Sequence, residues 1–161
     1  VNVVSPIADG AFNYYKYKFE GSFADENNKI INKIKVTPKR LSEPVMEGFI
    51  YIVDDSWAIY AVDLSIKGTQ MQTPALNTLN LKQNFSYNTI TKIWIKNTQT
   101  IDFEASIFTL KMNGSFTYVF SNFEFPEKFD KKTFSNEVLK FEENANKKDD
   151  ILNTLSYICV K

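Results

Sequence analysis

The clearest pattern in the chain is a pair of apolar runs between residues 45 and 68, VMEGFIYIVDDSWAIYAVDLSIKG, separated by an Asp-Asp-Ser break. β-Branched and aromatic residues dominate both runs, and the polar break is typical of a turn, so the pattern predicts a β-hairpin. A turn centred on Asp55 places Ile50 opposite Tyr60 and leaves both faces of the hairpin largely apolar. Because each apolar face needs cover, the second face is a candidate binding surface.

Alternating apolar and polar residues predict another hairpin before this one. Its strands span residues 11–23 and 30–37, and the polar residues 25–28 supply the turn between them. Two prolines in residues 38–44 place a loop before the central hairpin, because proline cannot donate a hydrogen bond to a neighbouring strand.

The same alternation returns at residues 79–87 and 93–103. A turn centred near Ile90 brings Gln83 opposite Asn97 on the apolar face, with Gln99 next along the strand. Two readings of these amides stay open: a cross-strand pair near the rim of the sheet, or polar contacts inside a ligand cavity.

An Asn-Gly pair at residues 113–114 predicts the last turn, between strands at 106–112 and 115–125, because both residue types tolerate positive φ. Beyond it, residues 133–148 carry apolar side chains at helical spacing, with charged residues on the other side. Residues 151–160 are apolar but ambiguous, so the tail at 149–161 is assigned to no element.

These patterns predict a mainly β (α+β) fold in a single domain, residues 1–161. The predicted architecture is a curved antiparallel sheet of about eight strands over residues 5–125, built from hairpins and bent toward a half-open barrel. One C-terminal amphipathic helix, residues 133–148, packs on it.

Composition excludes most common catalytic chemistry. The chain has no histidine, which removes Ser-His-Asp and Cys-His systems and most catalytic zinc sites. Cys159 is the only cysteine, so neither an intrachain disulfide nor a thiolate metal cluster can form. We therefore expect no enzyme activity, no cofactor and no metal site.

Charge and hydropathy limit the partners in the same way. Lys plus Arg and Asp plus Glu are equal at 19 each, and Arg40 is the only arginine, so we expect no nucleic-acid partner. No run approaches the roughly 20 apolar residues of a membrane-spanning helix, so we expect no membrane insertion by this segment.

Paired carboxylates are the one catalytic device that the missing histidines leave in place. In the register predicted for the central hairpin, Glu47 lies opposite Asp63, which makes these two residues weak candidates for acid–base catalysis. Directly opposed like charges destabilise a sheet, so a slipped register or solvent-exposed strand ends is the favoured interpretation.

The candidate ligand or partner face combines the apolar side chains of the central hairpin with the amides of the next one. Its residues are Phe49, Tyr51, Ile59, Tyr60, Gln83, Asn97 and Gln99.

Three blocks of sequence carry a resemblance to a known family. They are SPIADGAFNYYKYKFEGSF followed by INKIKVTPKR within residues 5–40, EGFIYIVDDSWAIYAVDL at residues 47–64, and NEVLKFEENANKKD at residues 136–149. In this order the blocks resemble a family of uncharacterised cell-envelope proteins of Bacteroidota. Such proteins carry a carboxypeptidase-regulatory-like domain, a conserved region of unknown function, which is the part matched here, and a C-terminal outer-membrane β-barrel.

The resemblance implies a place in the cell envelope, on the periplasmic side of the outer membrane, but no catalytic motif. The chain ends in ILNTLSYICVK, where the family pattern has a tryptophan-containing segment and an Arg-Pro-x-Pro-Leu-like stretch, so the barrel is not implied for this chain. The central hairpin and the strands after it also resemble, at the level of the fold, periplasmic lipoprotein-carrier domains, in which a curved sheet surrounds an apolar cavity.

Three functions remain open. The leading hypothesis is a non-catalytic, periplasm-facing domain that binds a lipid or other apolar ligand, or an envelope protein, on a concave sheet face. The alternatives are a carboxylate-dependent hydrolase acting on envelope glycan and a purely structural spacer.

Overall fold

The computed structural model describes residues 2–126 and 128. Contacts within the chain divide it into two compact units, Val1–Val119 and Phe120–Lys161. In the second unit the described residues form no helix or strand, and the rings of Phe123 and Phe125 stack with centroids 6.4 Å apart. The predicted helix at residues 133–148 and the tail at 149–161 lie outside the described residues, so they stay predictions, as does the single domain.

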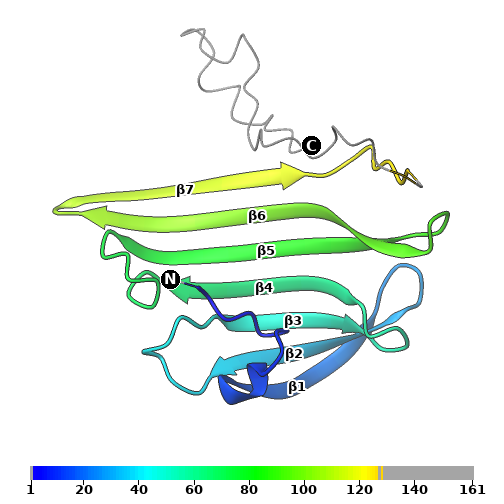
Figure 1. The fold of residues 1–161 in the computed structure, drawn as a ribbon, viewed down its shortest axis with the longest axis horizontal. Helices are drawn as coiled ribbons and strands as arrows, with labels where there is room; N and C mark the ends of the chain where they lie inside the picture. The colour runs from blue at the N-terminus through cyan, green and yellow to red at the C-terminus, as the bar shows by residue number, and fades with distance from the viewer. Residues whose placement is uncertain (1, 127, 129–161) are drawn as a thin grey trace, which may run out of the picture. The chain divides into compact units, whose positions relative to one another are not determined.

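In the first unit, seven strands form one open antiparallel sheet in which each strand pairs with the next along the chain (Figure 1). This confirms the mainly β prediction, with seven strands in place of about eight. A 3-10 turn, η1 (Ala11–Asn13), is the only helical element among the described residues. The strands are β1 (Tyr15–Ala24), β2 (Ile30–Pro38), β3 (Glu47–Val53), β4 (Ile59–Lys67), β5 (Leu76–Asn88), β6 (Ile93–Ile107) and β7 (Leu110–Val119).

The first hairpin forms where the polar turn predicts it. The Asp25 carboxylate accepts hydrogen bonds from the backbone N–H groups of Asn27 and Lys29, both at 2.8 Å, and Asn28 adopts the left-handed conformation at φ 57°. Asx turns of this kind reverse the chain without help from the rest of the fold. The loop between β2 and β3 also lies where its two prolines predict it.

Register sorts the side chains into rows that cross all seven strands, alternating between the two faces of the sheet. We call the face that carries most of the buried side chains the core face. One of its rows consists of Tyr17, Val36, Gly48, Leu64, Leu81, Ile101 and Phe116.

The opposite face, which we call the outer face, is mostly polar. Its neighbouring row consists of Lys18, Lys35, Phe49, Asp63, Lys82, Thr100 and Thr117. Within the central hairpin, however, this face carries the apolar side chains of Phe49, Tyr51 and Ala61, as predicted, with Glu47 and Asp63 as its carboxylates. Lysine covers part of these half-buried rings: the Lys33 ammonium lies 4.1 Å from the centroid of the Phe49 ring and 5.9 Å from that of Tyr51.

The register predicted for the central hairpin is also wrong. Trp57, at φ 55°, lengthens the turn, and a bulge at Tyr60 adds a further residue, so Ile50 pairs with Val62 rather than with Tyr60. The bulge also reverses the predicted faces of two side chains. Ile59 lies on the core face and Tyr60 on the outer face. Regular alternation cannot predict this, because a bulge breaks the period of two.

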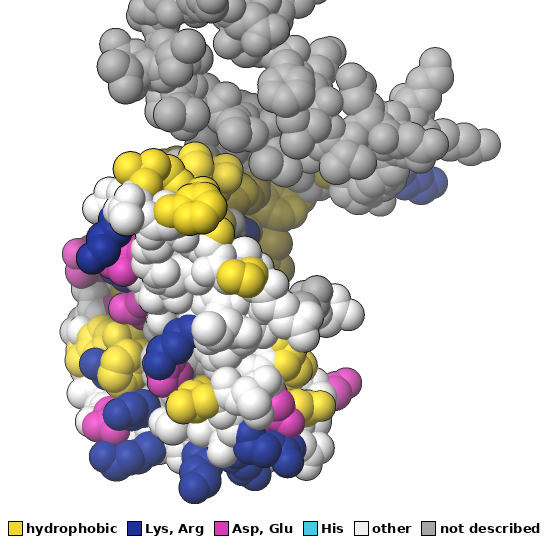
Figure 2. Space-filling model, turned by 90° about the vertical axis from the view of Figure 1, so that its left-hand side faces the viewer, with side chains coloured by type: hydrophobic (Ala, Val, Ile, Leu, Met, Phe, Trp, Pro, Cys, Tyr) yellow, Lys and Arg dark blue, Asp and Glu magenta, His cyan; other side chains and the backbone are white. Residues whose placement is uncertain are grey.

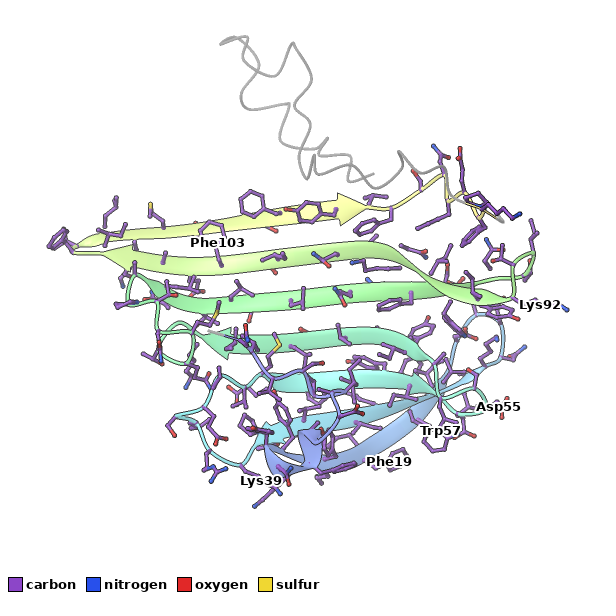
Figure 3. All side chains as sticks on the ribbon, in the orientation of Figure 1. Phe19, Lys39, Asp55, Trp57, Lys92 and Phe103 are labelled. Carbon is purple, nitrogen blue, oxygen red and sulfur yellow. The ribbon has the colours of Figure 1, made fainter. Side chains whose placement is uncertain are left out.

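The prediction of a turn at Asn113 and Gly114 is wrong for a different reason. Asn113 and Gly114 lie inside β7, and the chain reverses earlier, at Phe108 and Thr109. A Cβ on Gly114 would lie 2.5 Å from the ring of Phe103, its cross-strand partner (labelled in Figure 3). The glycine is needed there for the close approach of a ring rather than for positive φ.

We predict that Gly48→Ala strongly destabilises the sheet. Gly48 is the second residue of β3, at φ 142°, and a Cβ there would lie 2.1 Å from the backbone oxygen of Asp63. Backbone atoms of a paired strand cannot move aside without breaking the pairing. Gly21→Ala is the matched control, because Gly21 has a similar φ of 134° but open space where the Cβ would be.

Both substitutions place a side chain at positive φ and therefore carry similar backbone strain. The difference between their losses of unfolding free energy isolates the effect of steric overlap. We expect Gly48→Ala to lower the free energy of unfolding by at least about 2 kcal/mol more than Gly21→Ala does. Urea unfolding with a shared m-value measures this difference. Equal losses would contradict the register assigned to β3 and β4.

Candidate functional site

The N-terminal segment, residues 2–13, is held on the core face by backbone and hydroxyl hydrogen bonds. The N–H of Val4 donates to the carbonyl of Pro44 at 2.9 Å, and Val4 forms a short parallel bridge with Val45. The hydroxyl of Tyr15 donates to the carbonyl of Val4 and accepts from the backbone N–H of Met46 at 3.0 Å. One buried side chain therefore joins three segments of the chain.

A second set of contacts holds the rest of this segment. The hydroxyl of Tyr17 donates to the carbonyl of Pro6 at 2.7 Å, and the ring of Phe12 packs edge-on against the Tyr17 ring at 5.2 Å. The Lys39 ammonium donates to the carbonyl of Phe12 at 2.6 Å. Alternation places Tyr15 and Tyr17 on the same face of β1, so both hydroxyls reach the segment that lies on that face.

Burial raises the pKa of Tyr15 above the ordinary tyrosine value, partly offset by the hydrogen bond from Met46. The pKa of Tyr17 is also raised, first by burial and then by the neighbouring Tyr15. Both hydroxyls thus remain neutral donors over the physiological range of pH, which suits their bonds to backbone carbonyls.

Between the N-terminal segment and the sheet runs an apolar groove of about 310 Å³. This volume lies at the lower end of the range for small-molecule pockets, about 300–1,000 Å³. One wall comes from the N-terminal segment and the floor from β3, β4 and β5. The lining residues are Val3, Ser5, Pro6, Ile7, Met46, Ile50, Ile59, Val62, Leu64, Leu81, Gln83 and Phe85.

A pair of amides lies at the side of this groove. The side-chain amide of Gln83 donates to the side-chain oxygen Oε1 of Gln99 at 2.6 Å, and the Lys96 ammonium donates to the same oxygen at 3.0 Å. The turn is one residue longer than predicted, since Asn88 pairs with Ile93, and a bulge at Asn97 adds a second residue. Gln83 therefore lies opposite Gln99, and the predicted pairing with Asn97 is wrong. The amides of Gln83 and Gln99 pair across the strands, and Gln83 also lines the groove; a ligand contact by these amides stays a prediction.

The outer face has a shallower cleft of about 280 Å³ lined by Phe23, Tyr51, Tyr60, Ala61, Val62, Asp63, Lys82 and Asn84. Edge-to-face contacts link the rings of Phe23, Tyr60 and Trp94, with centroids 6.3 to 6.5 Å apart. The Lys29 ammonium lies 5.4 Å from the centroid of the Trp94 ring. Phe23 and Tyr60 line the cleft together with Asp63 and Lys82, so the cleft is less apolar than the groove.

The predicted ligand face is divided between these two surfaces. Ile59 and Gln83 line the groove, and Gln99 bonds to Gln83. Phe49, Tyr51 and Tyr60 lie on the outer face. Asn97 takes no part in either surface, because its side chain accepts a hydrogen bond from the Ser86 hydroxyl at 2.9 Å.

Sequence reasoning missed the wall of the groove. Val3, Pro6 and Ile7 belong to no strand, and their apolar side chains precede the first alternating segment. One signal in the sequence could have indicated it. Several apolar residues precede β1, and such residues are expected to be buried against another part of the chain.

The two candidate carboxylates are not opposite each other. Glu47 pairs with Ser65, and Asp63 pairs with Phe49, so the carboxylates are diagonal neighbours on the outer face, and both side chains are exposed. This agrees with the slipped register that the repulsion of like charges favoured. Among the described residues, no group of three or more His, Cys, Asp or Glu side chains could hold a metal ion.

Fold and groove together define an all-β domain whose open meander sheet is covered on part of one face by its own N-terminal segment. Residues 1–123 match the model of a family of unknown function, DUF5686, and the chain belongs to that family. Comparisons with curated proteins and with solved structures found no match. Within the described residues, no helix is long and apolar enough to cross a membrane.

We predict that Tyr15→Phe loosens the N-terminal segment. The substitution removes one hydroxyl and leaves the Val4 carbonyl and the Met46 N–H without their partner, which should lower the free energy of unfolding by about 1–3 kcal/mol. Urea unfolding and hydrogen exchange at the Val4 amide measure the change. Tyr14→Phe is the control, since the Tyr14 hydroxyl makes no hydrogen bond to a described residue; equal effects would contradict the role of Tyr15.

The raised pKa values of Tyr15 and Tyr17 predict a loss of stability at alkaline pH. The unfolded chain releases these phenol protons near the ordinary value of about 10, while the folded protein still holds them. The contribution of these two groups to the free energy of unfolding should therefore be constant below about pH 10. It should fall as the pH rises above that value. Urea midpoints measured across this range should fall less steeply for the double variant Tyr15→Phe, Tyr17→Phe; parallel curves would contradict the prediction.

Proposed function

We propose that this chain is a non-catalytic binding domain that takes an acyl chain or similar apolar ligand in the groove under its N-terminal segment. The observation that carries the proposal is the groove itself: a recess of about 310 Å³ with aliphatic side chains on its floor and its wall. Burying an alkyl chain there removes apolar surface of both partners from water, at about 25 cal/mol for each Å².

The polar groups of the groove fit an amphipathic ligand. Ser5 and Gln83 are the two lining residues with side-chain hydrogen-bonding groups, and a few such groups among apolar ones fix the orientation of a ligand. The headgroup of the ligand would lie near them, with its alkyl chain along Ile50, Val62 and Leu64.

A binding role is favoured over hydrolysis of a glycan by the geometry of the carboxylates. Glu47 and Asp63 are exposed and diagonal to each other on the outer face, away from the groove. A catalytic acid needs a water-excluded site to hold its proton near neutral pH. The purely structural spacer is the remaining alternative, and it differs in predicting that nothing enters the groove.

A place on the periplasmic side of the outer membrane is part of the proposal. It rests on the resemblance of residues 5–40 and 47–64 to cell-envelope proteins. An apolar ligand for such a domain would come from the lipids of that compartment.

We predict that Leu81→Trp blocks the groove. Leu81 lines it from β5 and is only partly buried, so a larger ring can be accommodated by filling the recess. Native mass spectrometry after incubation with palmitate should show a bound acyl chain on the wild-type protein and at least about tenfold less on the variant. Protein purified from an envelope fraction should carry a native ligand that organic extraction releases.

Ile101→Trp is the matched control. Ile101 is the cross-strand partner of Leu81 on the core face but does not line the groove. It should take up palmitate as the wild type does. Equal uptake by all three proteins, or none by the wild type, would count against a ligand in the groove and favour the spacer.

A further inference from the structure

The turn between β6 and β7 exposes a group of apolar side chains, which we call the apolar tip. Phe108 is 101% exposed, Leu110 61%, Ile107 46% and Met112 40%. Ile107 and Leu110 form the last pair of the hairpin, so Phe108 and Thr109 lie beyond the end of the sheet. Figure 2 looks onto this end and shows hydrophobic side chains gathered at its upper margin, over β6 and β7.

Folding does not explain why a phenylalanine occupies this position. The backbone of Phe108 is left-handed, at φ 53°, a conformation that Gly, Asn and Asp adopt readily and that is strained for a bulky side chain. Its ring is fully exposed and so gains nothing from packing within the described residues. A strained backbone that carries an exposed aromatic ring is more consistent with an external contact than with a structural role.

A second exposed aromatic residue provides a comparison within the same sheet. Trp57, in the turn between β3 and β4 at the opposite end of the sheet, is 77% exposed at φ 55° (Figure 3). It follows Asp54 and Asp55, two carboxylates that an anionic surface would repel. The apolar tip has no carboxylate between residues 106 and 112, and its one charge is the exposed Lys111.

The small size of the tip decides between a protein and a lipid surface. A stable protein interface buries about 800 Å² on each partner, more than four side chains around a two-residue turn can supply. A lipid surface has no such minimum, because each apolar side chain that enters the acyl region contributes by itself, and a lysine beside it adds attraction to anionic headgroups. Convex tips that carry aromatic and aliphatic side chains fit this kind of surface.

We propose that the apolar tip docks the domain on an anionic lipid surface, with Phe108 and Leu110 entering the acyl region and Lys111 at the level of the headgroups. This goes beyond the proposed function and does not depend on it, since the tip and the groove have no lining residue in common.

The test is co-sedimentation of the full chain with vesicles of phosphatidylcholine and phosphatidylglycerol in equal parts. Phe108→Asn should lower the partition coefficient by about tenfold or more, the order expected for one buried Phe side chain. Because Asn tolerates positive φ, the variant should be at least as stable as the wild type, which separates loss of docking from loss of folding. Leu110→Ser should reduce binding as well, without a change of turn conformation.

Trp57→Asn is the matched control, because it replaces an aromatic residue that is also exposed, at 77%, and has a similar φ, at the other end of the sheet. It should gain stability in the same way and bind vesicles within about twofold of the wild type. Vesicles of phosphatidylcholine alone should bind more weakly, because Lys111 then lacks anionic headgroups.

Three results would overturn the proposal. They are wild-type protein that does not sediment with the vesicles, unchanged binding by Phe108→Asn, or an equal loss in Trp57→Asn. Self-association that Phe108→Asn abolishes, without vesicle binding by the wild type, would assign the tip to a second copy of the chain instead.

Discussion

The hydrogen bonds of one tyrosine hydroxyl hold the N-terminal segment on the sheet. Tyr15 donates to the carbonyl of Val4 and accepts from the N–H of Met46, and its side chain is 1% exposed. Both partners are backbone groups in irregular segments, where no neighbouring strand can satisfy them. Because the segment forms one wall of the groove, these bonds help to keep the groove in place, together with those from Val4 to Pro44 and from Tyr17 to Pro6.

The N-terminal segment covers only part of the core face. One half of this face is therefore buried and the other is not covered by the segment. Over β1 to β4 the segment encloses a buried core that includes Val36, Ile50 and Leu64. Over β6 and β7 the same rows continue with Ile101, Phe103 and Phe116, which none of the core cluster covers. The core face is therefore apolar along the sheet, whereas the outer face combines lysines and threonines with the rings of Phe23, Tyr51 and Tyr60.

Sequence reasoning predicted the strands and their order of pairing better than their register. Alternation located the hairpins, and the Asp25 turn formed as its Asx chemistry predicts. Two bulges, at Tyr60 and Asn97, then moved every pair on their far side by one residue. A bulge shifts the alternation by one residue, but the position of the shift is hidden here, because the residues around Tyr60 are all apolar and those around Asn97 are all polar.

The candidate site was predicted only in part for the same reason. Ile59, Gln83 and Gln99 belong with the groove, whereas the bulge turned Tyr60 to the outer face beside Tyr51. The wall of the groove could not be predicted at all, since contacts between an irregular segment and a sheet follow no local period. Turn chemistry also misled where packing overrode it, as with Gly114, whose missing side chain makes room for the Phe103 ring.

Register gives the two proposed lipid contacts a physical connection on the core face. Leu81 lines the groove, and from it the cross-strand pairs Leu79–Phe103, Ala105–Met112 and Ile107–Leu110 lead along the strands to the apolar tip. On the other side of Leu81, the Gln83–Gln99 amide pair interrupts the apolar strip before Phe85. If the tip rests on a lipid surface, an acyl chain can reach the groove along this strip without crossing a polar row, and the amides mark where its headgroup would stop.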